Sequence, residues 1–484
     1  MKPGSDPTRP PDRMPTMSAS IVWFRNDLRL ADNPALIAAL GSGRAVVPVY
    51  VLDEETEGVR APGAASRWWL HHSLASLDAS LRALGSQLVL RRGPAEVAIA
   101  ELAAACGATS VYWNRVYDQG ARERDARLKQ SFTARGVIAE SHKANLLFEP
   151  WEVATQAGQP FKVFTSFWRA CRALRLPTAP LPAPKVLPAP RAWPQSDKLA
   201  DWRLLPTAPD WAGGMRASWT PGEAAATRRL TDFLDDALQR YRQARDLPAA
   251  RGTSRLSPHL AFGEISPRQI WRAATGLGHS AAVEKFLAEI GWREFAYNLL
   301  FHFGDLAQRN FRPEFDVFPW QEATDALEAW RRGRTGYPIV DAGMRELWTT
   351  GWMHNRVRMI TASFLTKDLL IDWRTGERWF WDTLVDADPA NNATGWQWVA
   401  GSGADAAPYF RIFNPVLQGE KFDPSGDYVR RWIPELASLP AETIHQPWTA
   451  KQPLPPEIYP ARLIDHAAAR DRALVAFKTL KRSA

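Results

Sequence analysis

Residues 20–36 read SIVWFRNDLRLADNPAL, in which a short apolar run gives way to a polar turn. Four further apolar runs with β-branched residues follow before residue 141: AVVPVYVL, QLVLRR, SVYWN and GVIAE. Helical stretches such as residues 63–84 and 94–106 separate them. Strands that alternate with helices are typical of a doubly wound α/β domain with a parallel sheet. The sequence therefore predicts such a domain over residues 20–145.

The turn after the first strand excludes one common function of such domains. The segment FRNDLRLADNPAL (residues 24–36) stands where a GxGxxG motif would bind a dinucleotide. We therefore do not expect a nicotinamide-dependent dehydrogenase.

The middle of the chain changes character. Residues 176–222 carry many prolines, which interrupt both helices and strands, so we predict an interdomain connector over residues 146–222 that lies on the surface. From residue 223 the apolar periodicity is helical, as in residues 223–245, 281–303 and 340–371. The sequence thus predicts a large all-α domain over residues 223–484.

Composition limits the remaining possibilities. No apolar run approaches the ~18 residues that span a bilayer, and the proline-rich residues 1–19, with Met17 as an alternative start, predict a disordered leader. Two cysteines exclude a disulfide framework, and no Cys/His pattern suggests a metal site. We expect a cytoplasmic monomer that binds no membrane.

Charge and aromatic content point weakly toward a polyanionic partner. The net charge is +8, but many basic proteins bind no nucleic acid. Of 23 tryptophans, ten lie between Trp292 and Trp398, which is more than core packing alone would require.

Two Ser-Pro pairs, at residues 257–258 and 266–267, each precede a helical run. Serine at an N-cap followed by proline is a standard helix start. Together with Thr253 and Ser254, Ser257 gathers hydroxyl groups where a phosphate could be held, although ordinary capping is the favoured explanation of this segment taken alone.

Several pairs of side chains could line one pocket. Glu289 and Trp292 share a helix face, as do Asn355 and Met359, whereas Trp396 and its second neighbour Trp398 point in opposite directions. Core packing is the simpler explanation of each pair alone. The arginines that could give this pocket a cationic rim are Arg293, Arg356, Arg358 and Arg411. Such a rim suits phosphates, and aromatic walls suit stacked bases.

Three segments carry a resemblance to a known family: residues 333–359 (GRTGYPIVDAGMRELWTTGWMHNRVRM), 386–398 (DADPANNATGWQW) and 407–436 (APYFRIFNPVLQGEKFDPSGDYVRRWIPEL). They resemble the flavin domain of the photolyase/cryptochrome family, and residues 21–36 resemble its N-terminal antenna domain. The resemblance covers roughly residues 20–440.

The resemblance implies FAD as cofactor and ultraviolet-damaged DNA as partner, with electron transfer from excited, fully reduced flavin to a flipped-out lesion. The residues that would hold the phosphates and ribityl chain are Tyr241, Thr253, Ser254, Arg255, Leu256 and Ser257. Those around the flavin ring would be Arg293, Asn355, Arg358, Asp386, Asp388 and Asn392, with Arg358 paired to Asp386 and Asn392 facing N5.

Electrons would reach the flavin along Trp320, Trp373 and Trp396. The lesion pocket would contain Glu289, Trp292, Asn355, Met359 and Trp398, and Arg245, Arg356 and Arg411 would also meet DNA. Of these, Glu289, Asn392, Trp398 and Met359 would act in catalysis.

Three members of the family compete. Repair of (6-4) photoproducts goes with a histidine pair, and this chain supplies only His354. A cryptochrome photoreceptor is the main alternative, since the motifs resemble plant cryptochromes. However, those carry aspartate where Asn392 stands, and no long signalling tail follows residue 440. The residues favour a carbon–carbon lyase that repairs cyclobutane pyrimidine dimers.

Three positions depart from the family pattern. Pro389 stands where leucine is expected and could disturb the local helix, and Asn298 stands where histidine is common. The residues that hold an antenna folate in some members of the family would fall near Gly120 and Ala121, and no carboxylate stands between these two. Methenyltetrahydrofolate bound in another mode, a deazaflavin and an empty antenna site all stay open.

Overall fold

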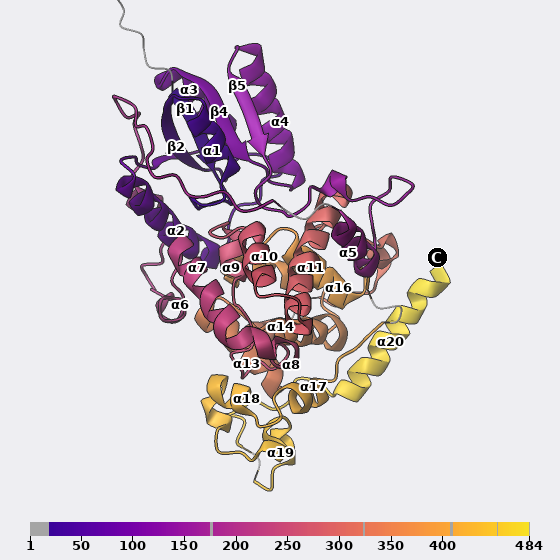
Figure 1. Cartoon of the computed structure of the whole chain (residues 1–484). Coiled ribbons are helices and arrows are strands. Elements are labelled where there is room, and N and C mark those ends of the chain that lie inside the picture. Colours follow the sequence, from indigo (N-terminus) through magenta and orange to yellow (C-terminus); the bar gives the residue numbers. More distant parts are fainter. Residues whose placement is uncertain (1–18, 175–177, 323–324, 407–409, 453, 484) are drawn as a thin grey trace, which may run out of the picture.

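The computed structural model describes residues 19–174, 178–322, 325–406, 410–452 and 454–483. An α/β part lies at one end of the molecule and a larger helical part at the other (Figure 1). The predicted leader falls almost wholly outside the described residues.

The sheet has five parallel strands in the order β3-β2-β1-β4-β5. Their bounds are β1 Ala19–Phe24, β2 Ala45–Leu52, β3 Val89–Arg92, β4 Ala108–Asn114 and β5 Ile138–His142. The helices between them are α1 Pro34–Gly41, α2 Ala64–Ala83, α3 Ala95–Ala105 and α4 Gln119–Ala134. The predicted doubly wound domain is confirmed.

Both faces of the sheet are covered because side chains alternate along each strand. In β1, Val22 and Phe24 pack with residues of α1 and α2. Ile21 and Trp23 point the other way and pack with residues of α3 and α4. This two-sided burial explains why the strands read as continuous apolar runs.

The helical part is built from many elements. They are α5 Phe164–Ala173, α6 Gly213–Ser218, α7 Glu223–Asp232, η3 Phe233–Ala237, η4 Leu238–Arg240, α8 Tyr241–Ala244, α9 Ser257–Ala261, α10 Pro267–Gly276, α11 Ala281–Phe303, η5 Pro313–Val317, α12 Asp325–Arg331, α13 Pro338–Thr350, α14 Asn355–Ser363, η6 Phe364–Asp368, α15 Trp373–Thr383, α16 Asn391–Ala400, α17 Pro415–Phe422, α18 Asp427–Trp432, η7 Pro434–Leu436, α19 Ala441–Ile444, η8 Pro447–Thr449 and α20 His466–Ser483. The predicted all-α character is confirmed.

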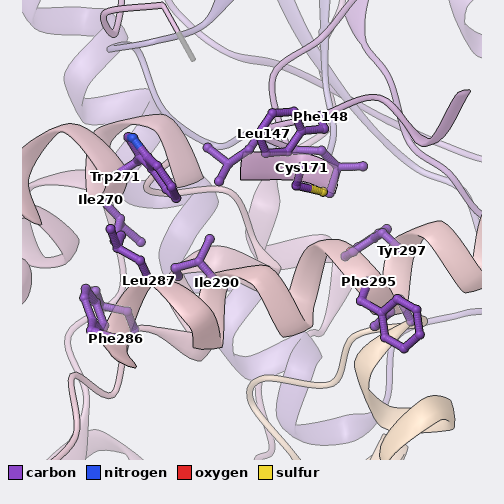
Figure 2. Close-up of a cluster of buried hydrophobic side chains, with 14 of the residues drawn as sticks. Leu147, Phe148, Cys171, Ile270, Trp271, Phe286, Leu287, Ile290, Phe295 and Tyr297 are labelled. Atoms are coloured by element: carbon purple, nitrogen blue, oxygen red, sulfur yellow. The ribbon is translucent and has the colours of Figure 1, made fainter. Parts of the chain in front are cut away.

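Two large apolar cores hold this part together. One surrounds α11 and includes Phe286, Ile290 and Phe295. Figure 2 shows these side chains along the helix, with Leu147 and Cys171 nearby. The other core surrounds α13, α14, α15 and α16.

The segment between the two parts is more structured than its proline content indicates. It contains the short helices η1 (Pro150–Glu152) and η2 (Leu199–Trp202) as well as α5 and α6. Phe167 and Cys171 of α5 are buried in the core around α11, and Trp202 packs against the sheet's helices. The boundaries 146 and 222 remain a proposal.

Two helix predictions need correction. The stretch 223–245 is not one regular helix, because a π-turn and a 3-10 turn separate α7 from α8. The stretch 340–371 breaks at Gly351, whose φ of 67° ends α13. His354 then starts α14, and its side chain accepts a hydrogen bond from the Arg356 N–H at 3.2 Å.

The Ser-Pro pairs differ in outcome. Ser266 caps α10 as predicted, because its hydroxyl accepts from the Gln269 N–H and the Gln269 side chain accepts in return. Ser257 is instead the first residue of α9 and makes no side-chain cap. Its hydroxyl accepts a hydrogen bond from the Trp352 indole at 3.2 Å, which links two segments of the helical part.

The polar turn after β1 joins the two parts. Buried Asp32 pairs with Arg268 at 2.7 Å and accepts a bond from the Ser266 hydroxyl. The backbone N–H groups of Leu30 and Ala31 donate to the Glu223 carboxylate. This segment therefore links the α/β part to the helical part, at the position where other α/β domains have a dinucleotide-binding turn.

Candidate active site

The acidic residues before α16 have separate partners. Asp388 accepts the backbone N–H groups of Ala390 and Asn391 at 2.9 and 2.7 Å, and the Tyr297 hydroxyl donates to it at 2.6 Å. Pro389 precedes the first helical residue, so it does not interrupt α16. The expected disturbance of the helix by Pro389 is therefore wrong.

The expected pairing of Arg358 with Asp386 is present. One guanidinium nitrogen of Arg358 donates to both carboxylate oxygens, at 3.0 and 2.8 Å, and its Nε donates to the Met353 carbonyl at 2.7 Å. The Asp386 side chain is almost fully buried. A buried carboxylate needs such a partner, so the pair holds α14 against the segment before α16.

Asn392 has a partner that the sequence did not reveal. Its amide nitrogen donates to the Glu377 carboxylate at 2.8 Å and to the Glu377 carbonyl at 3.1 Å. Arg60, which follows β2, donates twice to the same carboxylate and lies 3.9 Å from the centre of the Trp381 ring. Because the nitrogen is engaged, the oxygen of the Asn392 amide is the atom left to accept a hydrogen bond.

The hydroxyl-rich loop before α9 is tightly built. Arg255 has a left-handed φ of 51°, and its guanidinium lies over the rings of Trp219 and Trp352 at 4.4 and 4.7 Å. Gly252 allows the loop to approach α8, since a Cβ there would lie 2.5 Å from the Ala244 carbonyl oxygen. Tyr241 of α8 and Leu256 of the loop are buried, Thr253 and Ser254 are half-buried and Ser257 is exposed.

Trp292 and Trp398 are brought together by residues that the sequence analysis missed. Trp292 stacks on Phe164 of α5, with ring centroids 3.7 Å apart. The Phe164 N–H donates to the Asp405 carboxylate at 3.2 Å, and the Trp398 indole donates to the Asp405 carbonyl at 3.1 Å. Both tryptophans remain partly exposed.

Glu289 and the arginines expected to meet DNA form ion pairs. The Glu289 carboxylate pairs with Arg245 and, at 3.1 Å, with Lys285. Arg356 pairs with Asp246 at 3.0 Å. Met359 lies beside this group, with its sulfur 3.8 Å from the Arg356 guanidinium, and Asn355 is exposed at the start of α14.

The expected cationic rim is partly wrong. Arg293 is buried, donates to the Asn145 carbonyl at 2.7 Å and lies over the Tyr297 ring, so it points into the protein. Arg358 is held by Asp386 as described above. Arg356, like Arg358, is partly exposed, and Arg411 is fully exposed and lies 4.8 Å from the Phe413 ring.

The three tryptophans of the expected electron chain differ in exposure. Trp396 and Trp373 are buried, and the Trp373 indole donates to Asn310 at 2.9 Å. Gly376, one turn after Trp373 in α15, allows close contact, since a Cβ there would lie 2.1 Å from the Trp396 ring. Trp320 is half-buried, with its ring centroid 4.4 Å from that of Phe318.

We predict that Trp396→Phe slows photoreduction of a bound flavin sharply while leaving the flavin bound. Phenylalanine keeps the packing against Phe380 and Trp330 but is much harder to oxidise than an indole. Absorbance at the flavin bands during blue illumination with an external donor measures the rate. Unchanged photoreduction kinetics would show that Trp396 does not carry electrons to the flavin.

Several buried ionisable groups surround the site. Burial raises the pKa of Glu346 to about 7 despite bonds from the Tyr428 hydroxyl and the His354 N–H. Burial likewise lowers the pKa of His354 to about 4, so the imidazole is neutral at pH 7. Burial raises the pKa of Glu294 to about 7, although Leu147 and Phe148 N–H groups donate to its carboxylate.

We predict that Glu294→Gln relieves a pH-dependent loss of stability. The folded-state pKa of Glu294 lies above the ordinary value of 4.5. The contribution of Glu294 to the free energy of unfolding is therefore fully present below pH 4.5 and is lost as the pH rises toward 7. Glutamine keeps an acceptor for the two N–H groups without the charge. The variant should gain up to about 3 kcal/mol over wild type between pH 4.5 and pH 8. Urea unfolding at both pH values tests this, and a difference that does not change with pH would contradict it.

A small cavity lies between the sheet and the helical part. Asn26, Arg115 and Asp118 line it from the sheet side, and Arg293 and Pro389 from the other. Its volume of about 20 Å³ has room for little more than one water molecule, so this cavity does not accommodate a chromophore.

Within the described ranges, no helix has the length and apolar character needed to cross a membrane. Across the same residues, no group of three or more His, Cys, Asp or Glu side chains could hold a metal ion.

Comparisons with known proteins agree with this arrangement. Residues 286–479 match the family "FAD binding domain of DNA photolyase", and residues 20–185 match "DNA photolyase". The chain is 52% identical over 473 residues to a deoxyribodipyrimidine photo-lyase of Agrobacterium fabrum, covering 96% of this chain and 98% of that protein. It is 42% identical to cryptochrome-1 of Arabidopsis thaliana, covering 90% of this chain but 65% of that protein. The crystal structure of a bacterial class III photolyase from Agrobacterium tumefaciens superposes with a TM-score of 0.93, at 52% identity, over 96% of this chain and 98% of that one.

Proposed function

The chain belongs to the photolyase/cryptochrome family, and from this premise we propose that it repairs cyclobutane pyrimidine dimers in DNA with light. It is an enzyme, a deoxyribodipyrimidine photo-lyase. The observation that carries the activity is 52% identity, over nearly the full length of both chains, to a protein of that name. Loss of dimers from an irradiated oligonucleotide under near-ultraviolet light, with none lost in darkness, tests it.

The donors present fit FAD. The Arg255 Nε is buried without a hydrogen-bond partner among the described residues, and the Ser257 hydroxyl lies at an exposed position nearby. Such groups suit phosphates and a ribityl chain. Tyr241, Thr253, Ser254 and Leu256 would complete this end of the site. The free amide oxygen of Asn392 and the Arg358–Asp386 pair would meet the polar edge of the flavin ring.

When bound and fully reduced, FAD supplies the light-excited electron that splits the dimer. The protein's task is to orient the ring and to exclude negative charge from its N5 edge. Asn392, as a neutral amide, would place no charge at this edge. Its hydrogen bond to Glu377 fixes which end of the amide faces the ring. Asp388, held by Tyr297 and by the start of α16, supports the same segment.

The partly exposed side chains near Glu289 suit a flipped lesion. We propose that Trp292 and Trp398 contact the faces of the dimer, and that Met359 and Asn355 complete the pocket. Glu289 would bind the dimer's carbonyl groups, preferably as the neutral acid, which donates a hydrogen bond. Arg245, Arg356 and Arg411 would contact phosphates. Extrusion costs least for a damaged pair, because a dimer already stacks and pairs poorly.

We predict that Trp398→Ala weakens binding of dimer-containing DNA by roughly 1–3 kcal/mol, the usual value of a base–aromatic stack. Binding of undamaged DNA should change little, because it relies on phosphate contacts. Fluorescence anisotropy with matched damaged and undamaged duplexes measures both. Undiminished discrimination in the variant would show that Trp398 does not stack on the lesion.

A blue-light photoreceptor without repair activity is the second candidate. It is favoured by the 42% identity to an Arabidopsis cryptochrome. Asn392 favours the enzyme, because plant cryptochromes resemble this chain but carry aspartate there. The repair assay in the dark and in the light separates the two.

The remaining properties are proposals from the same resemblance. We propose that the protein acts as a cytoplasmic monomer on ultraviolet-damaged DNA. An antenna chromophore, either methenyltetrahydrofolate or a deazaflavin, would add an absorption band beside those of FAD. The absorption spectrum of the purified protein before and after illumination tests for it.

A further inference from the structure

A chain of alternating charges lies at the edge of the site around α11 and α14. Its members, in spatial order, are Lys285, Glu289, Arg245, Asp246 and Arg356. Glu289 pairs with Lys285 and Arg245, and Asp246 pairs with Arg356 at 3.0 Å and lies 3.8 Å from the Nε of Arg245. Each of the three cations in this series of charges therefore has a carboxylate beside it.

This pairing has a consequence for DNA binding. Arg245 and Arg356 are two of the three arginines proposed to meet phosphates, yet both are already neutralised, Arg245 by Glu289 and Arg356 by Asp246. A phosphate that approaches either arginine must compete with a carboxylate. In the free protein, Arg245 and Arg356 therefore attract a nucleic-acid backbone less strongly than unpaired arginines would.

We propose that Asp246 is a specificity-determining residue that suppresses binding of undamaged DNA by neutralising Arg356. The inference rests on the proposed repair function. When a flipped lesion binds the Glu289 carboxyl group, Arg245 loses its ion-pair partner. The Asp246 carboxylate then pairs with Arg245 instead of Arg356, and Arg356 becomes free to bind a phosphate. Undamaged duplex has no flipped lesion for Glu289 to bind, so Arg245 and Arg356 both keep their carboxylate partners.

The geometry allows this exchange without movement of the backbone. Asp246 already lies between the two guanidinium groups, so a rotation of its side chain changes its partner. Arg356 does not depend on Asp246 alone for its position. Its guanidinium also lies 4.4 Å from the Phe422 ring centre and 3.8 Å from the Met359 sulfur. The side chain therefore stays at the rim when its carboxylate leaves.

Asp246→Asn tests the proposal, because it removes the charge and keeps the shape. Affinity for undamaged duplex should rise by about two- to fivefold, which corresponds to the upper part of the range for releasing one partly exposed ion pair. Affinity for the same duplex with one thymine dimer should change by less than about twofold, since Arg356 is already free in that complex. The slope of log K against log salt for undamaged DNA should steepen by about 0.9, or one phosphate.

Two further variants separate this role from a general charge effect. Asp236→Asn removes a carboxylate paired with Arg240 at 3.0 Å, in the turns just before α8, and lowers the negative charge equally. It should change both affinities alike and only slightly. In an Arg356→Gln background, Asp246→Asn should give no gain for undamaged DNA. Flavin content and the unfolding temperature confirm that each variant is folded.

An equal gain for damaged and undamaged DNA in Asp246→Asn, or a gain that survives Arg356→Gln, would overturn the proposal. Equal affinity of the wild-type protein for both duplexes would instead overturn the proposed repair function. The two failures are therefore distinguishable in one set of titrations.

Discussion

Asn392→Asp is expected to abolish light-dependent dimer repair. In the wild-type protein the Asn392 amide donates to the Glu377 carboxylate, which Arg60 also holds. Aspartate would place a second carboxylate at hydrogen-bonding distance from that of Glu377, and like charges so close repel. The new carboxylate would be driven away from Glu377 toward the flavin edge. There it would put a negative charge in place of the neutral acceptor that favours the fully reduced, anionic flavin.

The measurement is repair per absorbed photon after chemical reduction, with the flavin redox state followed by absorbance. Asn392→Ala is the matched control, because it removes the amide without adding charge. It should keep measurable repair where Asn392→Asp shows none. Wild-type repair in Asn392→Asp would contradict the proposed role of this position.

Arg358→Met is expected to cause the second large effect, the loss of bound FAD. The Asp386 side chain is nearly fully buried, and Arg358 is its ion-pair partner. Breaking a buried pair by removing one member typically costs about 3–5 kcal/mol, because the remaining charge is left uncompensated. Spread over folding and cofactor binding, this cost should leave the purified variant largely without flavin.

Flavin absorbance per protein and the unfolding temperature measure the outcome. Arg345→Met is the matched control, since Arg345 has the same 24% side-chain exposure as Arg358 but pairs with Glu435, which is itself 24% exposed. That variant should retain its flavin. Full flavin occupancy in Arg358→Met would show that the pair does not support the cofactor site.

Much of the fold was predictable because local patterns decided it. The five strands and the long helix α11 follow from apolar periodicity that tertiary contacts do not override. The breaks inside residues 223–245 and 340–371 were not predicted. A single glycine such as Gly351 is compatible with a helix interior, and only packing decides that it ends α13.

Apart from the Arg358–Asp386 pair, which the resemblance predicted, the site was predictable as a set of residues and not as a set of contacts. The motifs pointed to Asn392, Glu289 and Arg356. The sequence carries no signal for Glu377 beside Asn392, for Arg60 beside Glu377 or for Asp246 beside Arg356, because ordinary acids and arginines occur throughout the chain. Arg60 reaches Glu377 across a separation of 317 residues, and no local pattern records such a pairing.

The same limit explains the error at Arg293. The charge of an arginine suggests a place at the rim, yet Arg293 is buried on the Asn145 carbonyl and the Tyr297 ring. Whether an arginine faces solvent or stabilises the interior depends on which carbonyls the fold brings near it. Sequence alone does not contain that information.

The repair reaction itself tests the central claim most directly. Fully reduced protein is mixed with an oligonucleotide that carries a cyclobutane thymine dimer, and thymine absorbance is followed under near-ultraviolet light and in darkness. We predict recovery of thymine absorbance in the light only, with a lower yield in Glu289→Ala. No recovery in the light, with the flavin confirmed reduced and the DNA confirmed bound, would contradict the repair function and favour the photoreceptor.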